Sequence, residues 1–184
     1  MQTFNKAKNA LSKIIFKRLK TSRYTFIILI LLLVAGLFFP GLSFISNKRI
    51  EGKVVRISDG DTITILVDGN KQERIRLHGI DCPESNQDFG QVAKKFTSDL
   101  CFGQRVAVEV RDVDRYGRIV GVVYNTDNVN VNLALLENGL AWHYTAYDQS
   151  LAFSAAEKKA RLNKQGLWSH KDAIAPWEFR KRKK

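Results

Sequence analysis

Three short segments of the sequence gather charged side chains of the kinds that bind metal ions, anions or protons. They are DGDT at 59–62, RLHGIDCPES at 76–85 and DRYGR at 114–118. Carboxylates bind hard cations such as Ca²⁺ or accept a proton from water, and arginine side chains bind phosphate oxygens. Taken singly, each segment is more typical of a solvated turn than of a functional site, because Asp, Gly and Pro are the common turn residues.

The elements that would position these segments can be predicted from hydrophobic periodicity. The Asp-Gly pair at 68–69 lies between two runs of alternating apolar residues, which is a strong hairpin pattern. In all, five runs rich in β-branched residues predict strands at 53–57, 62–70, 72–80, 105–113 and 118–124.

Three further segments predict helices, at 89–103, 131–139 and 150–166. In the first, Val92, Phe96 and Leu100 recur every four residues and predict the face that packs on the core. A glycine ends each segment, and Ser150 is a predicted N-cap. Five short strands with these helices favour an α+β domain, and a five-stranded OB-type barrel fits because it removes free strand edges.

The net charge of +12 is concentrated at the two ends of the chain. Seven of the 30 basic residues lie in 1–47, where there is no acidic residue, and five form the closing RKRKK at 180–184. The other 18 are balanced by all 18 acidic residues, so the high pI does not by itself indicate nucleic-acid binding. RKRKK is typical of a solvated tail; contact with phosphates or anionic lipid is the alternative.

An uncharged, largely apolar stretch from residue 24 to residue 47 follows the basic N-terminal segment. It is long enough to cross a bilayer as a helix, and the basic flank predicts a cytoplasmic N-terminus. We therefore expect a single-pass protein of the inner or plasma membrane, with the domain that follows outside the cytoplasm. The alternative is a cleaved signal peptide and a secreted form, although no clear A-x-A site follows the apolar residues.

The two cysteines, Cys82 and Cys101, are too few for a disulfide framework. Cys101 ends a predicted helix, and we interpret it as a buried small hydrophobic residue rather than as half of a disulfide. The three histidines lack the spacing of zinc ligands, so zinc is not expected.

Together, VVRISDGDTITILVDGNKQERIRLHGIDCPE, the downstream DRYGR and LLENGLAW resemble the staphylococcal nuclease (thermonuclease) family. The resemblance runs from about Lys53 to Trp168, and motif order and spacing agree in three separate places. It implies a five-stranded OB-fold barrel with three helices. The predicted organisation is a basic cytoplasmic tail at 1–23, a transmembrane helix at 24–46, a linker at 47–52, the nuclease-like domain at 53–170 and a basic C-terminal tail at 171–184.

The resemblance also implies roles for the charged residues. Asp61, Asp81 and the backbone carbonyl of Cys82 match the family's calcium ligands, although the family's type member has threonine where this chain has Cys82. Glu84 matches the proposed general base. The two phosphate-binding arginines correspond to Arg76 and Arg118.

Supporting roles follow for neighbouring residues. Asp59 and Thr62 lie in the turn that carries Asp61 and would support it. Aromatic residues that could stack on bases are Tyr116, Trp142 and Tyr144, with packing in the core as the alternative for Trp142.

These assignments predict a membrane-anchored, Ca²⁺-dependent nuclease that cleaves DNA, preferably single-stranded, and RNA, leaving 3′-phosphates. The alternative is a non-catalytic OB-fold module that binds single strands at the membrane. A binding module needs no cluster of carboxylates facing an anion, so Asp61, Asp81 and Glu84 favour the enzyme. A third hypothesis is an anchored scaffold whose basic tail binds lipid or acidic partners. The expected partners are nucleic acid and the lipid bilayer, without an obligate protein partner.

Overall fold

The structure is a computed structural model that describes residues 48–182. The predicted cytoplasmic tail and transmembrane helix, at 1–46, lie outside the described residues. Within the described part, no helix has both the length and the apolar character needed to cross a membrane.

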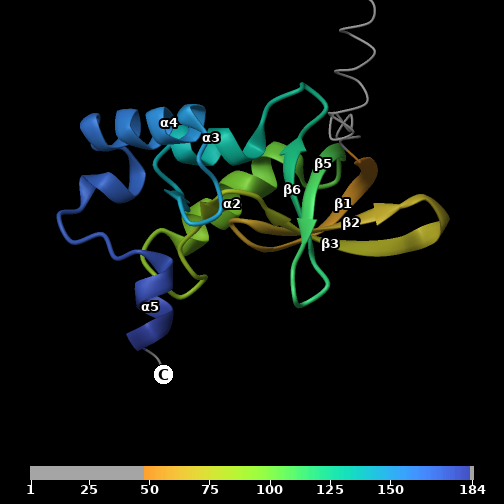
Figure 1. Cartoon of the computed structure of the whole chain (residues 1–184), viewed down its shortest axis with the longest axis horizontal. Coiled ribbons are helices and arrows are strands. Elements are labelled where there is room, and N and C mark those ends of the chain that lie inside the picture. The colour runs from red at the N-terminus through yellow and green to blue at the C-terminus, as the bar shows by residue number, and fades with distance from the viewer. Residues whose placement is uncertain (1–47, 183–184) are drawn as a thin grey trace, which may run out of the picture. The chain divides into compact units, whose positions relative to one another are not determined.

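A closed five-stranded barrel forms the centre of the described chain (Figure 1). Around the barrel the strand order is β1-β2-β3-β6-β5, and all neighbours are antiparallel except β3 and β6, which are parallel. The predicted five-stranded barrel is thus confirmed. Its strands are β1 (Arg49–Asp59), β2 (Thr62–Val67), β3 (Lys71–Leu77), β5 (Arg105–Val113) and β6 (Ile119–Tyr124).

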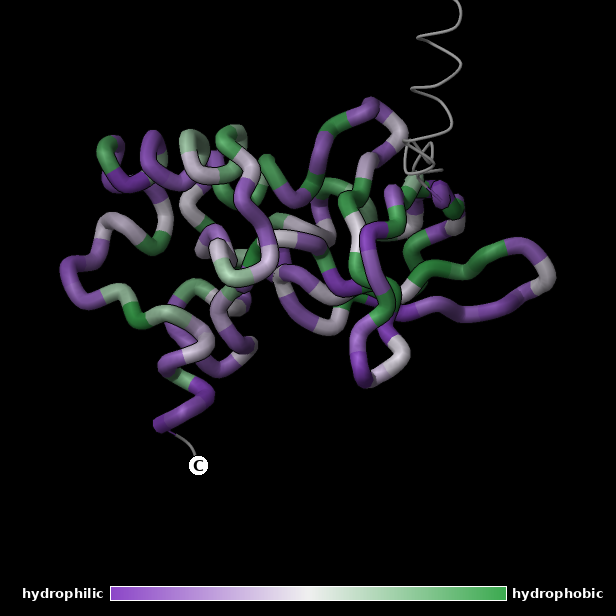
Figure 2. Tube along the Cα trace, in the orientation of Figure 1, coloured by the Kyte–Doolittle hydropathy of each residue, from purple (hydrophilic) through white to green (hydrophobic). Residues whose placement is uncertain are grey.

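Aliphatic side chains fill the barrel because alternate residues of each strand point inward. Ile63 and Ile65 of β2 and Ile75 of β3 are fully buried. Figure 2 shows hydrophobic residues along β2 and hydrophilic residues along the first half of β3, toward the tip of the hairpin. The packed interior of the barrel therefore fixes the positions of the strand ends.

The three predicted helices are present as α2 (Gly90–Cys101), α3 (Val131–Glu137) and α4 (Leu151–Leu162). The side chain of Ser150 accepts a hydrogen bond from the backbone N–H of Phe153, which confirms the predicted cap of α4. Short elements complete the fold: η1 (Asp68–Asn70), β4 (Ile80–Asp81), which pairs with β7 (Trp142–His143), η2 (Gly166–Ser169) and α5 (Pro176–Arg182).

The predicted face of α2 is confirmed in part, because Phe96 and Leu100 are partly buried and pack against the core. Val92 is 51% exposed, and the fully buried positions lie one residue later along the helix, at Ala93, Thr97 and Cys101. Small side chains there let α2 approach the turn between β1 and β2, where the Thr97 hydroxyl donates a 2.6 Å hydrogen bond to the carbonyl of Gly60. A Cβ atom on Gly60 would lie only 2.8 Å from that of Ala93, so this approach requires glycine.

Both ends of the predicted domain are longer than expected. Residues 49–52 are not a linker, because they pair with β5 from the start of β1 at Arg49. Residues 176–182 form helix α5, which buries Pro176 while Arg180, Lys181 and Arg182 are exposed. Hydrophobic periodicity did not predict either element, because both are rich in charged and polar residues and are amphipathic over only a few residues.

Asn132 of α3 joins that helix to the seam where β3 and β6 run parallel. This residue is fully buried, and its Oδ1 accepts a hydrogen bond from the N–H of Val123 at 3.0 Å. Its Nδ2 donates to the carbonyl oxygens of His78 at 2.9 Å and Gly121 at 3.3 Å. One amide thus satisfies backbone groups that follow β3 and lie within β6.

We predict that Asn132→Ala lowers the free energy of unfolding by about 2–4 kcal/mol, because it leaves buried backbone groups without partners. Urea unfolding followed by circular dichroism measures this change. Asn86→Ala, at an exposed position, is the matched control and should change stability by less than about 0.5 kcal/mol. Equal stability of the two variants would contradict the assigned role of Asn132.

Candidate active site

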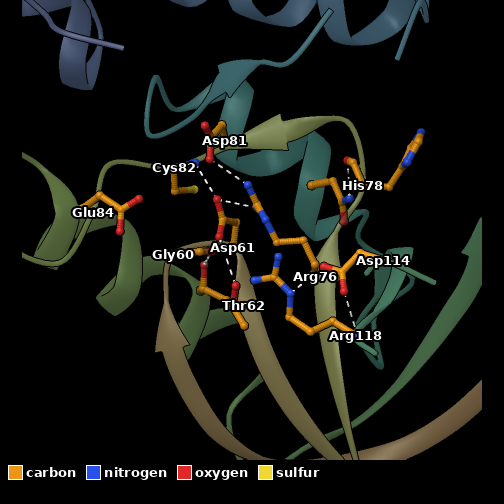
Figure 3. Close-up of polar contacts among 12 residues, drawn as sticks. Gly60, Asp61, Thr62, Arg76, His78, Asp81, Cys82, Glu84, Asp114 and Arg118 are labelled. Atoms are coloured by element: carbon orange, nitrogen blue, oxygen red, sulfur yellow. Dashed lines mark hydrogen bonds and ion pairs between the residues drawn. The ribbon is translucent and has the colours of Figure 1, made fainter. Parts of the chain in front are cut away.

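The first two charged segments of the sequence meet at one corner of the barrel (Figure 3). Asp61 lies in the turn between β1 and β2, Arg76 lies near the end of β3, and Asp81 ends β4. Figure 3 shows both carboxylates pointing toward the guanidinium of Arg76. Three elements that are separate in the sequence therefore place their charges together.

The guanidinium of Arg76 is the centre of this cluster. It forms an ion pair with Asp61 and a second one, at 2.7 Å, with Oδ1 of Asp81, and its side chain is only 16% exposed. Burial by itself would lower the pKa of Arg76, but the charges of Asp61 and Asp81 outweigh it and the pKa is raised. Arg76 therefore stays protonated within the protein.

Asp61 is held by the turn and by the chain that follows β4. Its Oδ2 accepts a 2.6 Å hydrogen bond from the backbone N–H of Cys82, and its Oδ1 accepts one at 3.2 Å from the hydroxyl of Thr62. The predicted supporting contact of Thr62 with Asp61 is therefore present.

A second carboxylate, Asp59 at the end of β1, lies beside Asp61. Its Oδ1 is buried and has no hydrogen-bond partner within residues 48–182. Burial, and next the negative charge of Asp61, raise the pKa of Asp59 to about 6. The turn thus holds more negative charge than its surroundings fully compensate.

An arginine that no sequence motif predicted as a site residue contacts the carboxylates of Asp81 and Glu84. Arg180 of α5 donates from Nη2 to Oδ2 of Asp81 at 2.8 Å and from Nη1 to Oε1 of Glu84 at 2.8 Å. Burial raises the pKa of Asp81 against the opposing influence of Arg180 and Arg76. Nothing in the local sequence distinguishes Arg180 from its basic neighbours, so no pattern could have identified it.

Arg118, from the third segment, lies next to the parallel seam. It precedes Ile119, which pairs with Ile75 of β3, the residue before Arg76. Its Nε donates to Oδ2 of Asp114 at 2.7 Å, which fixes the arginine within its turn. Slight desolvation of Asp114 is outweighed by the hydrogen bonds from Arg118, so the pKa of Asp114 is lowered.

The predicted aromatic contacts fall into two groups. Tyr116 is 68% exposed in the turn that carries Arg118 and is available to a ligand. Trp142 instead packs edge-on against Trp168, with ring centroids 4.5 Å apart, and Trp177 of α5 stacks on Tyr144 at 5.2 Å. Trp142 therefore has the packing role that was its alternative, and α5 covers one face of Tyr144.

The two thiols are free and buried. Cys82 donates its backbone N–H to Asp61, as described, while the thiol of Cys101 donates to the carbonyl of Thr97 at 3.0 Å. Burial raises the pKa of Cys82 well above its ordinary value and the pKa of Cys101 to about 12. The structure agrees with the expectation that no disulfide joins them.

The oxygen atoms at this corner have the chemistry that Ca²⁺ requires. Asp61, Asp81 and the carbonyl of Cys82 are hard oxygen donors, and the unpartnered Oδ1 of Asp59 leaves negative charge to be compensated. In this conformation, however, no group of three His, Cys, Asp or Glu residues in the described part could hold a metal ion. Guanidinium groups of Arg76 and Arg180 supply the positive charge instead.

We predict that both thiols of the folded protein resist modification at pH 8. With a pKa near 12, about one Cys101 thiol in ten thousand is ionised at that pH, and only the thiolate attacks a disulfide reagent. Reaction with an aromatic disulfide, followed by absorbance, should proceed at the unfolding rate, whereas urea-unfolded chain should react at both thiols at once. Rapid reaction of the folded protein would contradict this prediction, and so would a change in mass on reduction.

The sequence of this chain is similar to those of one family of proteins. The family model described as staphylococcal nuclease homologue matches residues 74–170. An uncharacterized endonuclease of Escherichia coli is 43% identical over 134 residues, which cover 73% of this chain and 87% of that protein. A micrococcal nuclease of Shigella flexneri is 44% identical over 145 residues, covering 73% of this chain and 82% of its own length.

A third relative, an uncharacterized endonuclease of Haemophilus influenzae, is 39% identical over 155 residues and covers 84% of this chain and 86% of that protein. The family match takes in Arg76, Asp81, Glu84 and Arg118, and the closed barrel agrees with the fold that the sequence resemblance implies. This chain belongs to the staphylococcal nuclease homologue family.

Proposed function

We propose that this protein is a Ca²⁺-dependent nuclease that hydrolyses phosphodiester bonds of DNA, preferably single-stranded, and of RNA. The observation that carries the proposal is the corner at which Asp61, Asp81 and Glu84 converge around arginine side chains, in a chain of this family. The printed names of the relatives, which include a micrococcal nuclease and two endonucleases, support the same activity.

The two arginines of the sequence motifs, Arg76 and Arg118, would bind the scissile phosphate. Arg76 is fixed by two carboxylates and Arg118 by Asp114, so each guanidinium is oriented before a substrate arrives. Planar guanidinium groups match the oxygens of a phosphodiester and stabilise the negative charge that builds up on them during attack. Positioning and charge compensation are the main contributions required for this reaction.

Glu84 would accept the proton of the attacking water molecule. It follows Asp81 by three residues, with Pro83 fixing the backbone between them, and its side chain is 34% exposed and so within reach of solvent. Attack by the water oxygen on phosphorus would break the bond to the 5′ oxygen, which would take up a proton from solvent, so the products would be a 3′-phosphate and a 5′-hydroxyl. A carboxylate beside a water molecule is suited to this transfer.

Asp61, Asp81 and the carbonyl of Cys82 would hold Ca²⁺, with Asp59 and Thr62 in support. When bound, Ca²⁺ would supply positive charge that polarises the phosphate and compensates the carboxylates. Because the predicted ligand at Cys82 is a backbone carbonyl, cysteine in place of threonine leaves that donor unchanged.

We expect Arg76→Ala or Arg118→Ala to reduce kcat on denatured DNA by about two to three orders of magnitude, which corresponds to loss of one preorganised electrostatic contact. Glu84→Gln should reduce it similarly, since the amide cannot accept the proton. Release of acid-soluble nucleotides by the full chain, with Ca²⁺ and with excess chelator, measures the rate.

Arg111→Ala, on an exposed part of β5, is the control and should retain activity. Undiminished cleavage in chelator would contradict the role of Ca²⁺. Binding of single strands without cleavage under either condition would favour the non-catalytic module.

We further propose that residues 24–46 anchor the enzyme in the membrane, with the nuclease domain outside the cytoplasm. Support comes from the uncharged apolar stretch and the basic residues before it. Protease added to intact cells, or to spheroplasts where there is an outer membrane, should remove the domain, with a cytoplasmic protein as the control. Protection of the domain until lysis would contradict this topology, and recovery of a shortened, soluble chain would indicate a cleaved signal peptide.

A further inference from the structure

Arg180 reaches the two carboxylates that the proposed reaction needs most. Asp81 is 1% exposed and Glu84 is 34% exposed, and one guanidinium bridges them at 2.8 Å on each side. Nη1 also lies 3.3 Å from Oδ1 of Asp81, so the contact with Asp81 is two-pronged. Such paired, charge-assisted hydrogen bonds are stronger and more specific than a single surface ion pair.

The segment that delivers Arg180 is itself anchored. Trp177 stacks on Tyr144 with an interplanar angle of 10° and packs edge-on against Trp142 at 5.6 Å. Just before the helix, the side chain of Gln87 donates a 2.6 Å hydrogen bond to the carbonyl of Ile174, and Ala175 is buried. α5 therefore has a defined docked position, which holds the arginine in place.

When α5 is docked, Arg180 donates hydrogen bonds to both carboxylate oxygens of Asp81. Arg76 bonds Oδ1 at 2.7 Å and Arg180 bonds Oδ2 at 2.8 Å, so both carboxylate oxygens face guanidinium groups. A divalent cation bound to either oxygen would lie within a few ångströms of the charge of Arg180, where the low dielectric of a buried site strengthens repulsion. The same guanidinium covers Oε1 of Glu84, the group that must accept a proton.

We propose that the guanidinium of Arg180 occupies this site in place of a divalent cation. Docking of α5 and binding of a divalent cation at Asp81 then exclude one another. This inference rests on the proposed function, because it takes Asp81 as a metal ligand. Release of α5 would free Asp81 and Glu84 and would also uncover the ring face of Tyr144 that Trp177 occupies. The C-terminal segment is thus an autoinhibitory element that Ca²⁺ and substrate must displace.

The test compares Ca²⁺ binding to the full chain with that of Arg180→Gln and of Arg182→Gln, a matched variant of an exposed arginine on the same helix. Isothermal titration calorimetry should give a dissociation constant about tenfold lower for Arg180→Gln than for the wild type, since a half-exposed, two-pronged ion pair no longer competes. Arg182→Gln should bind as the wild type does. Thermal unfolding in chelator checks that all three chains are folded.

Tryptophan fluorescence provides a second measurement, which does not depend on cleavage. Ca²⁺ should change the emission of the wild type because Trp177 leaves the ring of Tyr144, and Trp177→Phe should lose most of that change. With Arg180→Gln the same change should occur at a lower Ca²⁺ concentration.

Two outcomes would overturn the inference and can be told apart. If Arg180→Gln binds Ca²⁺ no more tightly than the wild type, while both cleave DNA only with Ca²⁺, then Arg180 is not a competitor although the proposed function stands. If neither protein binds Ca²⁺ at millimolar concentration and cleavage persists in chelator, the calcium site itself is wrong and the inference fails with it.

Discussion

Arg76 brings its positive charge into a corner of the barrel where its side chain is only 16% exposed, and two carboxylates compensate it there. Burial of any one of these charged groups alone would be unfavourable, because the ion would lose its hydration without forming a compensating ion pair. The turn between β1 and β2, the end of β3, and β4 must therefore stay in register with one another. The interaction that orients the candidate phosphate ligand also links three elements of the fold.

Charge at this corner is only partly balanced within the barrel. Asp59 has a pKa near 6 and a buried oxygen without a partner in the described chain, and Asp81 also has a raised pKa. An additional positive charge is favoured under these conditions, and the structure supplies one from α5.

The sequence predicted the parts of this molecule that local periodicity encodes. Alternating residues and the Asp-Gly turn identified the barrel strands, and Ser150 marked the start of α4, whereas α4 ends at Leu162 and the predicted stop Gly166 begins η2. On α2 the predicted residues Phe96 and Leu100 pack against the core, but the fully buried positions lie one residue later, because close packing on Gly60 selects small side chains. Arg180 was missed because its partners lie almost a hundred residues away, and no local pattern records such a contact. The roles assigned to Asp61, Glu84 and the other site residues, and the membrane anchor, remain predictions.

The parallel pairing of β3 with β6 has a consequence for how the chain acquires its site. Strands that run parallel cannot be joined by a tight turn, and here α2 and β5 lie between them in the sequence. Contacts of such long range form slowly compared with local ones. A nascent chain on the ribosome exposes Arg76 well before β6 has been synthesised to bring Arg118 beside it. The order of synthesis therefore delays the approach of the two arginine-bearing segments until the barrel closes.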